Sequence, residues 1–347
     1  MKKVGLTLVL CLAVVSFAGC GGGGEETAKQ VSPLQAAERE ASQPPPSGGR
    51  PLEVTIDGYA SPENVGVLLA DRLGYFADAG LNVDVSDPLT PVNIVSYTLN
   101  QPFTISHQPQ VIAATDKGVP IVAVGSVLPE PTLALIWLPD SGIESIGDLK
   151  GKTVGITGLS FEKDLLQFVL GKAGLTLDDV ELKRFDNELV PALVKRRADA
   201  ILGTWNVEGV QMEARGLDPV IQHVEDLGVP GFEELVVITH RNRLSQDPQS
   251  IRAFMSALAR GTEAAVEDPR LAAEAIAAAQ VDFAHGGYQP KPTVAEVEAT
   301  LPLLSRTGFM SRAGAARLSD WMHQEGFIRR RLPPSAFSTN GFLPSGS

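Results

Sequence analysis

The sequence predicts an α/β fold made of two lobes with a ligand cleft between them. From residue 51 onward, short β-rich runs alternate with helical runs, and this pattern restarts near residue 150. Such alternation is typical of largely parallel sheets that are covered by helices. The chain has 347 residues, of which 44% are hydrophobic, so it has enough apolar side chains for packed cores.

The first lobe begins with Leu52–Ile56, in which apolar and polar residues alternate as in a strand. Asn64–Leu73 follows as a helix, because Val65, Leu68 and Leu69 fall on one helical face before Gly74. The remaining elements expected here are strands at Leu81–Val85, Phe103–Ser106 and Ile121–Val127, and helices at Val92–Leu99 and Pro109–Lys117.

The second lobe repeats the pattern. We expect strands at Val154–Ile156, Glu181–Phe185, Ala200–Leu202 and Pro219–His223, and helices at Phe161–Ala173 and Val190–Arg197. After Thr239 the chain becomes helical, and these helices are expected to pack back on the first lobe. Their ranges are Pro248–Glu267, Arg270–Ala279, Val294–Leu304 and Arg312–Glu325.

Two β-rich runs, Thr132–Leu138 and Glu234–Thr239, are expected to cross between the lobes. Lobe 1 then comprises residues 51–135 plus 238–347, and lobe 2 comprises residues 136–237. A lobe that is inserted into another and joined to it by two strands forms a hinged clamshell. Ligand sites commonly lie in the cleft of such an arrangement.

The N-terminus predicts export. Residues 1–19 combine a short basic start with an apolar run, which is the layout of a secretory signal peptide. Phe17-Ala18-Gly19-Cys20 resembles the bacterial lipobox, which implies lipidation of Cys20 and an extracytoplasmic protein anchored to the cell membrane. The alternative is an ordinary signal peptide that is cleaved at a nearby small residue. Residues 20–50 are rich in Gly, Pro and polar residues and read as a flexible tether.

Composition excludes several functions. A net charge of −12 argues against nucleic-acid binding, because phosphate contacts require clustered Lys and Arg. Cys11 and Cys20 both precede the folded region, so no zinc cluster or nucleophilic thiol is expected there. The five histidines have no metal-ligand spacing, and nucleophile-elbow and phosphate-loop motifs are absent. We therefore expect a protein that is not an enzyme and needs no cofactor or metal.

Loops that leave the carboxyl ends of strands usually contact the ligand in such sheets. This rule points to the segments 57–60, 106–109, 157–162, 186–188 and 203–208. The candidate binding residues are Asp57, Tyr59, Asn64, Ser106, His107, Gln108, Ser160, Phe161, Glu188, Trp205, Asn206 and Glu208.

These candidates include aromatic rings, amides, hydroxyls and carboxylates but no Lys or Arg, which favours a neutral or cationic heteroaromatic ligand. Its ring would stack on Trp205, Phe161 or Tyr59, and carboxylates would accept hydrogen bonds from amino groups. Other interpretations remain open. Trp205 is also compatible with a packing role, and Glu208 with a carboxylate that is favoured in a first helical turn.

Several motifs resemble the solute-binding lipoproteins of ABC importers in the sulfonate/nitrate/thiamine-precursor superfamily. The broad motifs are Leu73-Gly74-Tyr75-Phe76, Gly80-Leu81-Asn82-Val83 and the run from Asp148 to Gly155. Sharper matches, to receptors for the pyrimidine precursor of thiamine, are Leu189-Val190-Pro191-Ala192-Leu193, Trp205-Asn206-Val207-Glu208-Gly209 and Leu227-Gly228-Val229-Pro230. The resemblance is strong from Leu52 to Gly261.

This resemblance implies the type II periplasmic-binding fold. It also implies a small heteroaromatic ligand and an ABC permease as the membrane partner. We expect the protein to be a monomer. The family commonly has an aromatic residue at three positions where this chain has Gly58, His107 and Thr204. Their loss would widen the pocket, so a larger ring such as riboflavin is an alternative ligand. Two further alternatives are a pyrimidine-modifying enzyme and a sensor built on the same fold. The fungal enzyme of this superfamily uses a Cys-rich motif, which this chain lacks.

Overall fold

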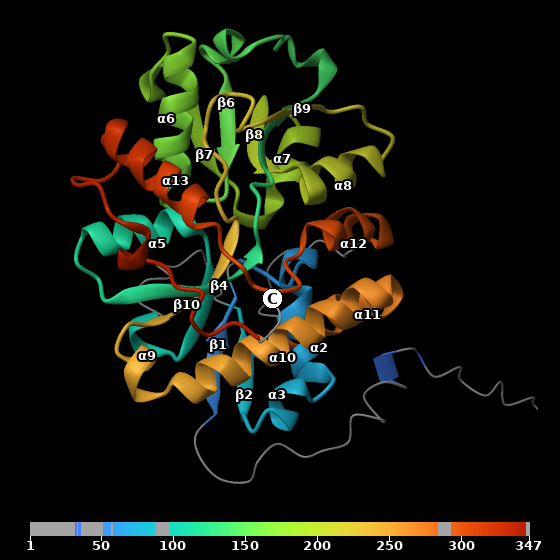
Figure 1. The fold of residues 1–347 in the computed structure, drawn as a ribbon. Coiled ribbons are helices and arrows are strands. Elements are labelled where there is room, and N and C mark those ends of the chain that lie inside the picture. Colours follow the sequence, from blue (N-terminus) through green and yellow to red (C-terminus); the bar gives the residue numbers. More distant parts are fainter. Residues whose placement is uncertain are drawn as a thin grey trace, which may run out of the picture. The chain divides into compact units, whose positions relative to one another are not determined.

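The computed structural model describes residues 32, 34–35, 51–56, 58–87, 98–283 and 293–344 (Figure 1). The signal peptide, Cys20, nearly all of the expected tether, Asp57 and most of the expected helix Val92–Leu99 lie outside the described residues. No helix in the described part of the chain is long and apolar enough to span a membrane.

The first sheet has five strands in the order β2-β1-β3-β10-β4. Their bounds are β1 Leu52–Thr55, β2 Val83–Ser86, β3 Phe103–Ser106, β4 Ile121–Leu128 and β10 Leu235–His240. Strand β1 pairs in parallel with β2 and β3, whereas β10 runs antiparallel between β3 and β4. Strands β3 and β4 are buried along their whole length, which fits the mostly apolar sequence of β4, whereas β3 also buries Thr104 and Ser106.

The second sheet has the same plan, in the order β7-β6-β8-β5-β9. Its strands are β5 Leu133–Trp137, β6 Thr153–Ile156, β7 Glu181–Arg184, β8 Ala200–Thr204 and β9 Val220–His223. Strand β6 is parallel to β7 and β8, and β5 is antiparallel to β8 and β9. The antiparallel strand of each sheet is thus one of the two predicted crossing segments, β5 or β10.

The predicted α/β fold class with two βα halves is confirmed. The carboxyl ends of β1, β3, β6 and β8 feed the loops in which the sequence predicts ligand contacts. The antiparallel pairing of the crossing strands follows from the chain path, because β4 leads directly into β5 and β9 leads back into β10.

Seven helices accompany the first sheet in the described residues: α2 Val65–Arg72, α3 Tyr75–Asp78, α5 Gln108–Asp116, α9 Arg243–Gln246, α10 Pro248–Glu267, α11 Pro269–Asp282 and α12 Val294–Thr300. Helices α2 and α10 pack closely at two glycines, Gly66 and Gly261. Beneath them, Phe254 stacks on Phe76 and on Phe103, with ring centroids 5.1 and 4.3 Å away.

Helices α6 Glu162–Lys172, α7 Leu189–Val194 and α8 Val210–Glu213 accompany the second sheet. The last helix, α13 Arg312–Gln324, was expected to pack on the first lobe, but it also packs on helix α6 of the second. Its Trp321 meets Phe168 of α6 edge-on, with ring centroids 5.0 Å apart. Leu318 of α13 belongs to the same buried cluster as Leu165 of α6 and Ile112 of α5. Its apolar face is therefore covered by helices of both halves.

Candidate ligand-binding pocket

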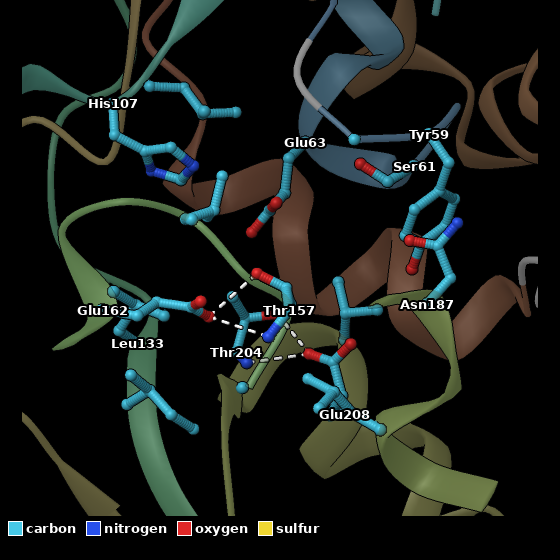
Figure 2. A pocket seen from close by; sticks show the side chains of 17 residues that line it. Tyr59, Ser61, Glu63, His107, Leu133, Thr157, Glu162, Asn187, Thr204 and Glu208 are labelled. Atoms are coloured by element: carbon cyan, nitrogen blue, oxygen red, sulfur yellow. Dashed lines mark hydrogen bonds between the residues drawn. The ribbon is translucent and has the colours of Figure 1, made fainter. Parts of the chain in front are cut away.

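A pocket of about 110 Å³ lies where loops from both sheets meet (Figure 2). Its walls come from the segment after β1, from the residue after β3, from the loops after β6 and β8, and from the start of α7. The lining residues are Gly58, Tyr59, Ser61, Glu63, His107, Leu133, Thr157, Leu159, Glu162, Asn187, Leu189, Leu202, Gly203, Thr204, Val207, Glu208 and Leu235.

Glu162, the first residue of α6, holds the loop after β6 in place. One carboxylate oxygen, Oε1, accepts hydrogen bonds from the backbone nitrogen and the hydroxyl of Thr157, at 3.0 and 2.8 Å. The other oxygen accepts from the backbone nitrogen of Gly158 at 2.7 Å. Gly158 adopts a φ of 104°, which residues with side chains rarely tolerate. Because both oxygens are engaged, Glu162 shapes the wall of the pocket.

Glu208 has a related arrangement after β8 but keeps one oxygen open. Its Oε2 accepts hydrogen bonds from the backbone nitrogen and the hydroxyl of Thr204, both at 2.7 Å. Neither of the two Thr204 donors uses Oε1, which leaves that oxygen on the side of the pocket. Glu208 lies in a π-helical turn, Trp205–Gly209, a rare geometry that is frequent at functional sites. A side chain at Gly203 would lie 3.3 Å from the carboxylate, so this glycine gives Glu208 its room.

Glu63 enters the pocket from the segment after β1 (Figure 2). Its Oε1 accepts hydrogen bonds from the Thr132 hydroxyl at 3.1 Å and from the Asn206 side-chain amide at 3.2 Å. Both donors converge on this one oxygen, and no described residue donates to Oε2. Loss of water contact and the neighbouring charges of Glu234 and Glu208 raise the pKa of Glu63 to about 7, although the Asn206 hydrogen bond and His107 oppose the shift.

His107 forms part of the wall and is oriented by a buried carboxylate. Its Nδ1 lies 2.8 Å from Oε1 of Glu234, and the other oxygen of Glu234 accepts a hydrogen bond from the backbone nitrogen of Thr132 at 2.8 Å. The ring also packs against Phe161, with centroids 4.9 Å apart. A carboxylate partner on Nδ1 fixes the tautomer and the orientation of the imidazole.

The pocket is acidic. Removal from water is the largest cause that raises the pKa of both Glu162 and Glu208, and their hydrogen bonds to Thr157 and Thr204 oppose it. No Lys or Arg is among the lining residues. An anionic ligand would face like charges there, whereas a donor-rich or cationic one would find acceptors. Within the part of the chain that the structure describes, no cluster of His, Cys, Asp and Glu is suited to a metal ion.

Three of the predicted binding residues line the pocket: Tyr59, His107 and Glu208. Five others lie in or behind its walls as buried residues: Asn64, Ser106, Gln108, Phe161 and Asn206. The Ser106 hydroxyl donates to Oε1 of Gln110 at 2.8 Å, and Oε1 of Gln108 accepts from the backbone of Glu233 at 3.1 Å. These side chains support the loops that carry the pocket.

The remaining predicted residues lie apart from the pocket. Ser160 is exposed. The Glu188 carboxylate, 45% exposed, pairs with Arg197 at 2.7 Å. Trp205 packs on the cluster around α7 and meets His223 edge-on at 5.8 Å, which is the packing role left open above. Asp57 lies outside the described residues, and the assignment of binding residues stays a prediction.

Sequence reasoning missed several lining residues, above all Glu63 and Ser61. Two others, Glu162 and Thr204, lay in the indicated segments but were not singled out. A repeated pattern could have revealed them: a Thr at the end of a strand is followed by a Glu five residues later (Thr157, Glu162) or four residues later (Thr204, Glu208). Glu63 has no such local signal, because its partners Thr132 and Asn206 are distant in sequence.

The two matching sheets and the pocket between their loops define a periplasmic-binding-protein fold. An alkanesulfonate-binding protein from Xanthomonas axonopodis pv. citri, solved with bound MOPS, superimposes with a TM-score of 0.63 at 16% identity, covering 84% of this chain and 99% of that one. The aliphatic sulphonate-binding protein of Escherichia coli gives a TM-score of 0.61 at 14% identity, with coverage of 86% and 95%. At these identities the likeness shows the fold alone.

The chain belongs to the NMT1/THI5-like family, whose model matches residues 61–272. It is 33% identical over 221 residues to a formylaminopyrimidine-binding protein of Halalkalibacterium halodurans, covering 63% of this chain and 67% of that protein. The resemblance inferred from the sequence motifs is thus confirmed.

One expectation is contradicted by these relatives. A 4-amino-5-hydroxymethyl-2-methylpyrimidine phosphate synthase of Legionella pneumophila is 26% identical over 300 residues, which is 84% of this chain and 92% of that protein. Fungal relatives carry the same name, among them one from Schizosaccharomyces pombe. The family therefore contains enzymes as well as binding proteins, and the expectation of a non-enzyme was wrong because short catalytic motifs do not mark this family's chemistry.

Proposed function

We propose that the chain is the extracytoplasmic receptor of an ABC importer and binds a small aminopyrimidine that serves as a thiamine precursor. The observation that carries this proposal is Glu208. Thr204 fixes one of its oxygens, and the other is open in a pocket whose lining contains no Lys or Arg. The name of the formylaminopyrimidine-binding relative supports the ligand class.

In this proposal Oε1 of Glu208 accepts a hydrogen bond from an amino group of the ring. The ring lies against apolar walls such as Leu133 and Leu202, with Tyr59 as the aromatic side chain of the lining. The ligand contacts loops of both sheets at once, so its binding favours the closed arrangement of the two halves. The permease partner, export, lipidation of Cys20 and the monomeric state expected from the sequence are parts of the same proposal.

The size of the pocket bears on which ring binds. A volume of about 110 Å³ supports a single substituted ring over the three fused rings of a flavin. Riboflavin is therefore the disfavoured ligand, although Gly58 and Thr204 add little bulk to the lining.

The test compares two carboxylates by calorimetric titration with 4-amino-5-hydroxymethyl-2-methylpyrimidine. Glu208→Gln should weaken binding about tenfold or more, because a charge-assisted hydrogen bond contributes roughly 1.5–3 kcal/mol. Glu213→Gln, on the exposed surface of α8, is the matched control and should bind like the wild type. Equal affinities in the two variants would remove Glu208 from the site.

A catalytic role is a second candidate, which the synthase names of several relatives favour. The pocket offers groups suited to proton transfer. His107, which is paired with Glu234, and Glu63, whose pKa is about 7, both lie in its wall. Mass spectrometry of a pyrimidine incubated with the protein tests this role. A changed ligand mass that depends on His107 would support catalysis, and an unchanged mass with bound ligand would support the receptor.

A further inference from the structure

The pocket contains a second carboxylate with one tethered and one open oxygen, on the side opposite Glu208. We propose that Glu63 is a ligand-binding residue that shares a proton with a basic ring nitrogen, so that the site selects amino-substituted N-heterocycles over their oxo counterparts. This inference rests on the proposed function and names the chemical property by which the ligand is chosen.

The geometry separates Glu63 from the other carboxylates of the pocket. Both oxygens of Glu162 are occupied by hydrogen bonds from Thr157 and Gly158. In Glu63 the two donors, Thr132 and Asn206, share Oε1. Oε2 has no hydrogen-bond donor among the described residues, and the carboxyl group points into the space bounded by Thr157 and Glu208 (Figure 2). Tethering by one oxygen leaves the other available to a ligand without repositioning the side chain.

Glu63 and Glu208 together define what the ligand must offer. Each presents one open acceptor, one from the segment after β1 of the first sheet and one from the turn after β8 of the second. An aminopyrimidine has an exocyclic amino group next to a ring nitrogen, and that nitrogen becomes a donor when it is protonated. Its oxo counterpart lacks the amino donors and the basicity, so it leaves at least one carboxylate desolvated and unpaired.

The electrostatic surroundings favour a proton at this position. The charged groups that act on Glu63 are Glu234 and Glu208, which repel a second negative charge, and His107, which opposes them. The nearby helix α12 adds Glu296, which acts on Glu208. Helix α11 contributes Gln280, an uncharged side chain that donates to the backbone oxygen of Ala60 at 2.9 Å. The pKa of Glu63, near 7, agrees with a carboxyl that holds a proton in the physiological range.

The proton balance makes the proposal measurable. Above pH 7 the free protein has an ionised Glu63 and the free aminopyrimidine is neutral, so a complex with one shared proton must take that proton from the buffer. Affinity then falls up to tenfold for each pH unit above the pKa of Glu63, as linkage requires. Between the pKa of Glu63 and the lower pKa of the ligand, Glu63 already holds the proton and affinity is constant.

The experiment is titration calorimetry at pH 8 with 4-amino-2-methylpyrimidine and with its 4-oxo analogue, each in two buffers that differ in ionisation enthalpy. We expect the wild type to take up close to one proton per amino ligand and to prefer it to the oxo analogue by tenfold or more. Glu63→Gln should lose the proton uptake and most of this preference. Glu63→Asp keeps a carboxyl and should retain the uptake at lower affinity, which separates the loss of the acid from damage to the fold.

Binding of the amino ligand without proton uptake by the wild type would overturn the role of Glu63, as would a Glu63→Gln variant with unchanged uptake and preference. If either result comes with a loss of affinity in Glu208→Gln, the proposed function stands and only this inference fails. If the wild type binds neither pyrimidine, both fail together.

Discussion

The Asn206 side-chain amide joins the two halves of the molecule, because its nitrogen donates to Oε1 of Glu63 at 3.2 Å and to the hydroxyl of Thr300 at 2.9 Å. Asn206 follows β8 of the second sheet, whereas Glu63 follows β1 of the first and Thr300 ends α12. One buried side chain therefore links the loop that carries Glu208 to the segment that carries Glu63.

Removal of this link should destabilise the protein. Asn206→Ala leaves the Thr300 hydroxyl and the Glu63 carboxylate each without one donor, which typically costs about 1–3 kcal/mol. Urea unfolding at pH 7 measures the loss. The exposed Asn242→Ala is the control and should change the free energy of unfolding by less than about 0.5 kcal/mol. Equal stability of the two variants would show that the link contributes nothing.

The close packing of α2 and α10 should not tolerate a methyl group at Gly261. A Cβ there would lie 2.0 Å from the backbone oxygen of Gly66 and 2.7 Å from the backbone nitrogen of Ala70, so the helices must separate. Gly261→Ala should lower the free energy of unfolding by about 1–3 kcal/mol or more. Gly171→Ala in α6, where the new methyl meets open space, should instead raise it by roughly 0.5–1 kcal/mol. Thermal unfolding should therefore show a lower unfolding temperature for Gly261→Ala and a higher one for Gly171→Ala than for the wild type.

Stability should fall as the pH rises from 4.5 to about 7. The pKa of Glu63 is raised from its ordinary value of 4.5 to about 7, so in this range the folded state binds more protons than the unfolded state. Linkage then requires the free energy of unfolding to decrease with pH. Urea midpoints at pH 5 and pH 7.5 measure the slope. Glu63→Gln should make the slope shallower, because other carboxyls with raised pKa values, among them Asp71, contribute in the same direction, and an unaltered slope would contradict the assignment.

Tyr59 and Trp205 should affect different properties. Tyr59 lines the pocket, so Tyr59→Ala should weaken ligand binding by about 1–4 kcal/mol, as is usual for an aromatic anchor. Trp205 packs on His223 and the α7 cluster, so Trp205→Ala should mainly lower the unfolding temperature. Titration and melting of both variants distinguish these roles. A larger loss of affinity in Trp205→Ala would favour the stacking role that the sequence suggested.

Thr204 should matter through its hydroxyl. Thr204→Val keeps the backbone hydrogen bond to Glu208 but removes the side-chain one, and we expect affinity to fall about tenfold because the carboxylate is less firmly placed. Thr204→Ser retains the donor and should bind like the wild type. Similar affinities for the valine and serine variants would show that the backbone contact alone positions Glu208.

The alternating pattern was sufficient to predict the strands and the long helices, because burial and periodicity are local properties of the chain. Helix α10 spans the predicted range, Pro248–Glu267. The packing of helix α13 could not be predicted from the sequence. Its apolar face indicates that another element covers it, but does not indicate that Phe168 of α6 contributes to this contact.

The site was predictable only where strand ends signal it. His107 directly follows β3 and Glu208 lies in the turn after β8, so both fall in the indicated segments and line the pocket, while their role in binding stays a prediction. Glu63 was missed because its importance comes from Asn206 and Thr132, which approach it only after folding. Trp205 is an aromatic residue within a family-like motif, which is why the sequence suggests a stacking role. In the structure it begins the π-helical turn, its ring contacts His223, and it is not among the residues that line the pocket.

Calorimetric titration of the wild-type protein with 4-amino-5-hydroxymethyl-2-methylpyrimidine at pH 7 tests the central claim most directly. The account predicts saturable binding of one ligand per chain, lost about tenfold or more in Glu208→Gln. No binding by the wild type, or the same affinity in the two proteins, would contradict it.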